Sequence, residues 1–193
     1  MARRPVLRAV AAAVLVAVSF AGCSGLEGTG DKGYVTSDGR VTELDAGDRG
    51  SAVSITGEDL DGNDLDLADF RGKVVVMNVW GNWCGECHAE AADVVGAAEE
   101  TIGDDVAFVG INVRDSSAAT ARSYERQYDV PFPSFYDPSG EKLLAFDGSL
   151  PISATPSTMV LDREGRVAAS VIGVLPTKQT LVSMIEKVVA EDG

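Results

Sequence analysis

Nearly unbroken runs of apolar, mostly β-branched residues occur twice in the chain, at residues 73–80 and 105–113. Such runs are typical of strands that are buried on both faces of a sheet. Between them, residues 91–102 carry apolar side chains at helical spacing, and Gly103 ends this pattern. The pattern predicts a strand, a helix that begins near Gly85 and a second strand, an order that implies a parallel pair with a right-handed crossover.

Shorter patterns surround this unit. Before it, residues 55–60 and 65–67 flank a turn signal at Asp61 to Asn63 and predict a β-hairpin. After it, residues 115–130 begin with capping residues and predict a helix. Residues 132–137 predict a short extended piece, which we expect to lie between this helix and the next elements.

The end of the chain predicts three further elements. Residues 139–148 predict one or two helical turns, and residues 155–173 predict two antiparallel strands joined at Asp162 to Gly165. Thr177 caps a last helix with one apolar face. Together these elements predict an α/β fold with a central mixed β-sheet, helices on both faces and an N-terminal β-hairpin.

The first 22 residues differ from the rest of the chain. They contain three arginines near the start and an apolar run from Val10 to Phe20, the pattern of a signal peptide that directs export. The segment SFAGC resembles a bacterial lipobox, in which Cys23 becomes the lipidated first residue of the mature protein. The alternative is an ordinary signal peptide cut near Cys23, which would leave a free thiol there.

Residues 23–50 are rich in Gly, Asp, Ser and Thr, and we expect them to form a flexible tether from the membrane to the domain. The domain itself is expected to span residues 51–193. Without the signal segment the chain has 13 basic and 30 acidic residues, a net charge of −17. This charge argues against nucleic acid as a partner.

The segment NVWGNWCGECHAE, residues 78–90, carries the chemistry. Cys84 and Cys87 have the spacing of a redox dithiol, and with His88 they also have the spacing of a c-type haem attachment site. If Cys23 carries lipid, these two cysteines form the one remaining pair, in an exported context that permits disulfides. A pair so close in sequence closes too small a loop to be a structural brace, which favours a redox role.

The pair lies where the first buried strand ends and the long helix begins. A thiolate at a helix N-terminus is stabilised by unpaired N–H groups and by the helix dipole. We therefore expect the pKa of Cys84 to be lowered and Cys84 to be the attacking sulfur. Cys87 is one helical turn further on, on the same side but deeper, where it can resolve the mixed disulfide.

Trp83-Cys84-Gly85-Glu86-Cys87 after an apolar strand resembles the thioredoxin active site, and Thr155-Pro156 stands where that family has its Pro before the third core strand. The entry hairpin, Glu90 and the segment PSTMVLDREGRV are similar to the membrane-tethered thioredoxin-like proteins of the TlpA/ResA type.

The resemblance implies a thiol–disulfide oxidoreductase on the extracytoplasmic face of the cell membrane, without a cofactor. Many such proteins reduce apocytochrome c with electrons from a membrane thiol transporter, whereas some relatives oxidise exported proteins. Cys84 and Cys87 would form the redox-active disulfide, and Trp83, Thr155 and Pro156 would shape the substrate groove. Glu90 would exchange the proton of Cys87, or would only complement the helix dipole.

Three residues in and beside the motif are expected to tune its reduction potential, namely Gly85, Glu86 and His88. Thioredoxins have Pro at the place of Glu86. A carboxylate there disfavours a neighbouring thiolate and opposes the helix dipole. The positive form of His88 would act in the opposite sense, although His88 can also be only a partly exposed helix residue.

Four other classes of site are weighed against the dithiol. A c-type haem also needs an axial ligand; the candidates are Met77, Met159 and Met184, and of these Met77 and Met184 lie at core positions. A zinc site lacks a fourth ligand, and no metal is expected. A thiol peroxidase would have Pro and Thr where Met77 and Gly81 stand. A tethered binding module with an inherited dithiol is the remaining alternative.

Overall fold

The computed structural model describes residues 41–146 and 154–191 of the chain. The predicted signal peptide, Cys23 and the first part of the predicted tether lie outside these residues. The helices and strands in chain order are β1 (Val41–Glu43), β2 (Thr56–Glu58), β3 (Asp64–Asp66), the 3-10 helix η1 (Leu67–Phe70), β4 (Val74–Trp80), α2 (Gly85–Thr101), β5 (Val106–Val113), α3 (Ala118–Tyr128), β6 (Ser134–Asp137), the 3-10 helix η2 (Glu141–Phe146), β7 (Ser157–Leu161), β8 (Val167–Ile172) and α4 (Lys178–Ala190).

A six-stranded sheet in the order β1-β8-β7-β4-β5-β6 forms the centre of the described domain. β4, β5 and β6 are parallel to one another, whereas β7 is antiparallel to β4 and β8 is antiparallel to β7. The parallel pair predicted from the two apolar runs and the predicted antiparallel pair near the end of the chain are both confirmed. The short extended piece at residues 132–137 proves to be the edge strand β6.

Both faces of β4 are buried along its whole length, as its almost entirely apolar sequence predicts. Val74 and Val76 belong to a core cluster with side chains of α2 and α4. Val75 and Met77 point the other way, into a second cluster that includes η1 and η2. This alternation is the period of two that every strand imposes on its side chains.

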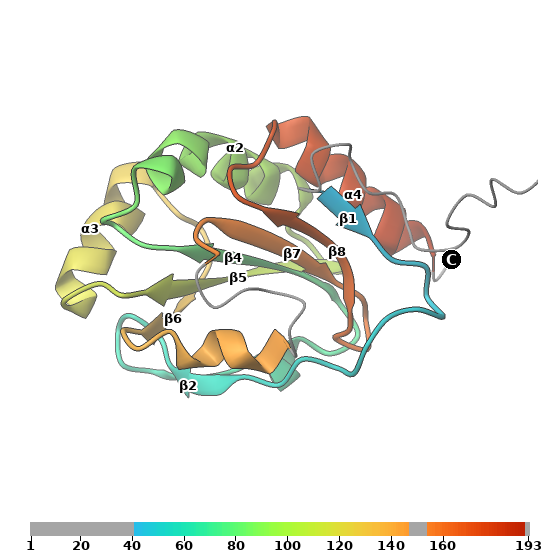
Figure 1. Ribbon diagram of the computed structural model, residues 1–193, viewed down its shortest axis with the longest axis horizontal. Coiled ribbons are helices and arrows are strands. Elements are labelled where there is room, and N and C mark those ends of the chain that lie inside the picture. The colour runs from blue at the N-terminus through green and yellow to red at the C-terminus, as the bar shows by residue number, and fades with distance from the viewer. Residues whose placement is uncertain (1–40, 147–153, 192–193) are drawn as a thin grey trace, which may run out of the picture. The chain divides into compact units, whose positions relative to one another are not determined.

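The α-helices α2, α3 and α4 cover one face of the sheet, and the β2–β3 hairpin with η2 covers the other (Figure 1). The predicted hairpin is thus confirmed, and the predicted helical turns are confirmed at Glu141–Phe146. The predicted helices on both faces are present, but within residues 41–146 and 154–191 the helices on the second face are of the 3-10 type. The reason is that the crossover through α3 leads to the parallel strand β6, on the same side as the crossover through α2.

The start of the domain was predicted wrongly. Residues 41–50, expected to be part of a flexible tether, include β1, which pairs with β8 from Val41↔Val171 to Glu43↔Ala169. Val41 is buried in the core cluster below α4. A three-residue edge strand in a segment rich in Gly and Asp leaves almost no periodic signal, because its stability comes from the strand it joins.

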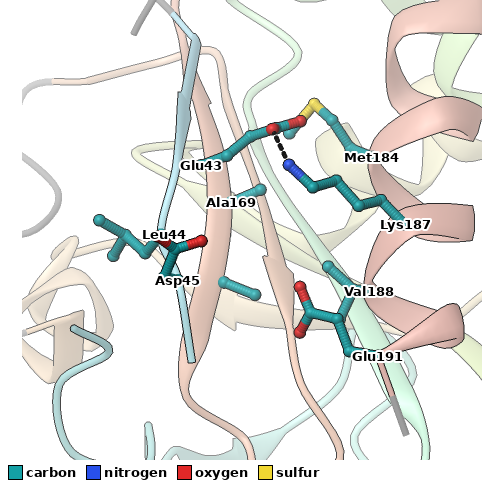
Figure 2. Close-up of a pocket in the computed structure, with 9 residues that line it drawn as sticks. Glu43, Leu44, Asp45, Ala169, Met184, Lys187, Val188 and Glu191 are labelled. Atoms are coloured by element: carbon teal, nitrogen blue, oxygen red, sulfur yellow. Dashed lines mark hydrogen bonds and ion pairs between the residues drawn. The ribbon is translucent and has the colours of Figure 1, made fainter. Parts of the chain in front are cut away.

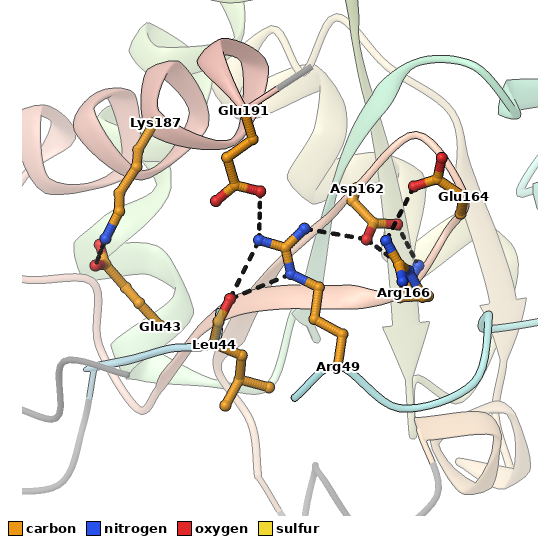
Figure 3. Close-up of polar contacts among 8 residues, drawn as sticks. All are labelled: Glu43, Leu44, Arg49, Asp162, Glu164, Arg166, Lys187 and Glu191. Carbon is orange, nitrogen blue, oxygen red and sulfur yellow. Dashed lines mark hydrogen bonds and ion pairs between the residues drawn. The ribbon is translucent and has the colours of Figure 1, made fainter. Parts of the chain in front are cut away.

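Arg49 fastens this N-terminal segment to two distant parts of the domain (Figure 3). Its side chain is 3% exposed, and the guanidinium donates to Asp162 Oδ2 at 3.1 Å, to Glu191 and to the carbonyl oxygen of Leu44. Asp162, which is 1% exposed, also accepts from the side chain of Arg166 at 2.8 Å. Buried charges require such partners, so this network fixes residues 44–49 against the β7–β8 turn and the end of α4.

A cavity of about 50 Å³ lies between β1 and α4, and the ion pair of Glu43 with Lys187 spans it (Figure 2). Asp45 and Glu191 also line the cavity. None of the residues that line this cavity belongs to the segment around Cys84 and Cys87. Within residues 41–146 and 154–191, no helix has the length and the apolar character that crossing a bilayer requires.

Candidate active site

Cys84 and Cys87 meet at the first turn of α2, just after the short loop that follows β4. Cys84 is the N-cap of α2, with an extended backbone at φ −90° and ψ 106°. The backbone N–H of Cys87 donates to Cys84 Sγ at 3.1 Å. The two sulfurs form a disulfide, with the Cα atoms 5.2 Å apart. Since this N–H and the helix dipole both favour negative charge on Cys84 Sγ, the fold stabilises a thiolate at that position.

The two cysteines differ in exposure. Cys87 is fully buried, and Cys84 is 5% exposed at the edge of an apolar cluster that contains Trp80 and Tyr124. Trp83, just before Cys84, is 51% exposed, and its indole Nε1 donates to the carbonyl oxygen of Val113 at 2.9 Å. The exposed area of the disulfide is therefore small and belongs to Cys84, next to an exposed indole.

Glu90 is a buried carboxyl group one helical turn after Cys87, on the same face of α2. Its Oε2 accepts from the backbone N–H of Leu175 at 2.7 Å, and its Oε1 accepts from Asn78 Nδ2 at 3.2 Å. Burial raises the pKa of Glu90 to about 7, although these two hydrogen bonds act to lower it. The nearby carboxylates of Asp93 and Glu86 add to the rise. Glu90 can thus both bind and release a proton near neutral pH.

The loop before the dithiol, residues 81–83, is held by the end of β5. The buried carboxylate of Asp115 accepts from the backbone N–H of Asn82 at 2.9 Å and from Asn112 Nδ2 at 2.6 Å. A Cβ atom at Gly81 would stand 2.4 Å from the Trp83 indole nitrogen, so only glycine fits under this ring. These contacts set the path on which the chain enters α2.

Pro156 lies at the same end of the sheet as Cys84. The peptide bond between Thr155 and Pro156 is cis. Ser157 pairs with Val79, so the next position of this register brings Pro156 beside the carboxyl end of β4. The carbonyl oxygen of Pro156 accepts from the backbone N–H of Gly173 at 2.9 Å. The hydroxyl oxygen of Thr155 is buried and has no hydrogen-bond partner.

The Redoxin family model matches residues 45–189 of the chain, which is most of its length. The chain belongs to the Redoxin family. The thiol-disulfide oxidoreductase ResA of Bacillus subtilis is 31% identical over 118 residues, which are 61% of this chain and 63% of that protein. This chain therefore spans slightly less than two thirds of that relative.

Two solved structures cover more of this Redoxin chain. A DsbF homologue from Corynebacterium diphtheriae is 34% identical and has a TM-score of 0.69, covering 82% of this chain and 99% of its own. A secreted thiol-disulfide isomerase from Corynebacterium glutamicum is 30% identical and has a TM-score of 0.73, covering 82% and 97%. The predicted thioredoxin-like fold and the similarity to proteins of the ResA type are confirmed, and the chain is a thiol–disulfide oxidoreductase by its family and relatives.

The remaining predicted residues of this Redoxin site lie in or beside the first turn of α2. Gly85 and Glu86 are exposed. His88 places Nε2 at 2.9 Å from the carbonyl oxygen of Asn82 and Nδ1 at 2.8 Å from the Tyr128 hydroxyl. Both ring nitrogens are thus occupied by protein partners, which leaves neither for a haem iron and favours the dithiol interpretation of the C-x-x-C-H spacing.

Two residues that contribute to the site, Tyr124 and Asn78, were not predicted from the sequence. Tyr124 donates its hydroxyl to the carbonyl oxygen of Cys87 at 2.9 Å and stacks on Trp80, with ring centroids 4.3 Å apart. Burial raises its pKa, so it stays a neutral donor. Asn78 binds Glu90, and its signal was present as a polar residue within a buried apolar strand. Across the described part of the chain, no group of three or more His, Cys, Asp or Glu side chains is arranged to hold a metal ion.

Proposed function

We propose that this protein is an extracytoplasmic thiol–disulfide oxidoreductase that exchanges disulfides with exported proteins, and that its reduced form acts on the C-x-x-C disulfide of apocytochrome c. The observation that supports this most is the unequal burial of the dithiol. Cys84 keeps a small exposed area, 5%, beside the exposed Trp83, whereas Cys87 is fully buried and Glu90 is 2% exposed. A protein disulfide can approach the first sulfur and be released by the second.

The exchange proceeds in two steps that balance. The Cys84 thiolate attacks one sulfur of the substrate disulfide, whose S–S bond breaks, and the other substrate sulfur leaves as a thiolate and takes up a proton. Cys87 then gives its proton to the Glu90 carboxylate and attacks Cys84 Sγ, which releases the second substrate sulfur. The substrate gains two electrons and the Cys84–Cys87 disulfide forms. Two electrons from a membrane thiol transporter would restore the dithiol.

The direction of electron flow is tested by the reduction potential of the Cys84–Cys87 pair. For a reductant of apocytochrome c we expect a value close to that of thioredoxin, about −270 mV, whereas a value near about −120 mV would assign the protein to oxidation of exported proteins. Equilibration with glutathione or dithiothreitol buffers measures it. The same measurement on His88→Ala tests whether His88 tunes the pair, because an unchanged potential would end that idea.

The proposed location depends on the lipobox-like segment that ends at Cys23. We expect a labelled fatty acid to be incorporated into the wild-type chain, and the protein to sediment with membranes. Cys23→Ser should lose the label and leave the membrane fraction while keeping its disulfide exchange in solution, because Cys23 is far in sequence from the dithiol. A wild-type chain that is cut to a free, unlabelled Cys23 would refute the anchor without touching the proposed chemistry.

A further inference from the structure

Asn78 is a polar side chain in the middle of the buried strand β4, and it is 5% exposed. Its Nδ2 donates to Glu90 Oε1 at 3.2 Å and to Thr158 Oγ1 at 3.1 Å. One amide nitrogen therefore joins the buried carboxyl group of α2 to the neighbouring strand β7. A buried amide needs partners for its donors, so both contacts must be kept once Asn occupies this position.

The second oxygen of Glu90 is held from another direction. Leu175, whose backbone N–H donates to Glu90 Oε2, lies in the segment between β8 and α4, two residues after Gly173. Gly173 in turn donates to the carbonyl oxygen of Pro156, and Thr158 lies two residues after Pro156. Both donors of Glu90 are thus anchored to chain segments that flank the predicted substrate groove.

We propose that Asn78 is a positioning residue for the dithiol, whose amide, held by Thr158, keeps the Glu90 carboxyl group where it exchanges the proton of Cys87. This inference rests on the proposed function, in which Glu90 takes that proton. A purely structural role explains the presence of an asparagine at position 78 less well, because an aliphatic side chain at this place in an apolar strand would need no hydrogen-bond partners.

Burial and the charges around Glu90 raise its pKa, and the hydrogen bond from the Asn78 amide opposes this rise. Glu86 and Asp93 on α2 and Tyr124 on α3 are the titratable groups that act on it electrostatically, and each is acidic or neutral. The β8–α4 segment and β7 contribute the N–H of Leu175 and the hydroxyl of Thr158, which do not titrate. Hydrogen bonds to the ionised carboxylate oppose its burial, and Asn78 supplies one of the two.

The first test is the titration of Glu90 in Asn78→Leu, which has a similar shape and no donor. In protein labelled with ¹³C at glutamate carboxyl groups, we expect the midpoint of the Glu90 signal to rise by about one pH unit, because the carboxylate loses one of two donors. The resolving step, followed as release of a thiol from a preformed mixed disulfide, should slow about fivefold at pH 7 and recover above pH 9.

Variants of Thr158 and Glu90 provide the controls. Thr158→Val, which removes the acceptor that orients the amide, should shift the midpoint in the same direction by less, and Thr158→Ser should restore it. In a Glu90→Gln background, Asn78→Leu should slow resolution no further. The Thr158 pair carries the test if Asn78→Leu does not fold.

An unchanged Glu90 midpoint in folded Asn78→Leu, or an additive loss of rate in the Glu90→Gln background, would overturn the inference. In the first case Asn78 does not act on the carboxyl group, and in the second it acts on the rate by some other route. The titration needs no protein substrate. It therefore reports on the hydrogen bond even if exported proteins prove not to be substrates.

Discussion

Replacing Cys84 with serine is expected to abolish disulfide exchange, with a loss of ~10³-fold or more in the rate of insulin reduction. A serine hydroxyl is not ionised near neutral pH, and the features that stabilise charge at this position act only on a group that can lose its proton. In the structure these are the N–H of Cys87 at 3.1 Å and the N-terminus of α2. The variant should keep its fold, because the serine oxygen can cap the helix in the same way.

Replacing Cys87 with alanine gives the complementary result. Cys84 can still attack a substrate disulfide, but no second thiol remains to release the product, so mixed disulfides accumulate. In cells that express Cys87→Ala, we expect higher-mass species on non-reducing gels that collapse to the monomer when a reductant is added. Mass spectrometry of these species identifies the substrates, and apocytochrome c should be among them if the proposed function holds.

The double variant Cys84→Ser/Cys87→Ala is the matched control and should trap nothing. Trapping that survives in the double variant would point to Cys23 or to a non-specific reaction. If Cys87→Ala traps no protein and the wild type fails to reduce insulin, the proposed role of Cys84 as nucleophile is wrong.

Glu90→Gln is expected to slow the resolving step about 10²-fold at pH 7.5 and to remove its pH dependence near neutrality. In the wild type the rate should rise with pH through about 7, as the carboxyl group ionises and can accept the Cys87 proton. Glutamine has nearly the same shape but cannot take a proton. Stopped-flow measurement of product release between pH 5.5 and 9 distinguishes a lost base from a general disturbance.

The free energy of unfolding should also depend on pH because of Glu90. The folded pKa of Glu90 is raised from 4.5 to about 7, so between these values the folded state holds a proton that the unfolded state has released. This contribution to stability is present below about pH 4.5 and is lost as the pH rises through about 7. Glu90→Gln should remove that slope from the free energy of unfolding, measured by urea denaturation of the oxidised protein across this range.

Glu99→Gln is the matched control, since Glu99 lies on the same helix but is exposed. It should leave both the rate profile and the slope of stability with pH as in the wild type. A Glu90→Gln variant with an unchanged rate profile would show that Glu90 only complements the helix dipole, which is the alternative that the sequence left open.

Much of the fold and the centre of the site could be predicted from local pattern. The apolar strand before Cys84, the helix after Cys87 and the strand pair after Pro156 all follow from periodicity over short windows, because burial of a face repeats every two or 3.6 residues. That Cys84 lies at a helix N-terminus with Cys87 one turn deeper follows from the same pattern. The structure agrees with each of these predictions.

The contacts that the sequence could not supply are those between residues far apart in the chain. β1 is a strand because it pairs with the edge of β8. The side chain of Arg49 is buried because the fold brings Asp162 and Glu191 next to it, where they form ion pairs with it. Neither leaves a signal in its own neighbourhood. This is why the domain begins at least ten residues before its predicted start.

The state of Glu90 shows the same division. The sequence by itself placed this carboxyl group one turn after Cys87, and it determined the dithiol, the helix and the strand on which both depend. Only the tertiary structure decided that Glu90 is buried, that Asn78 and Leu175 donate hydrogen bonds to its two oxygens, and that its pKa is raised to about 7. Sequence spacing sets which side chains share a face, whereas desolvation and hydrogen bonding depend on what other segments bring against that face.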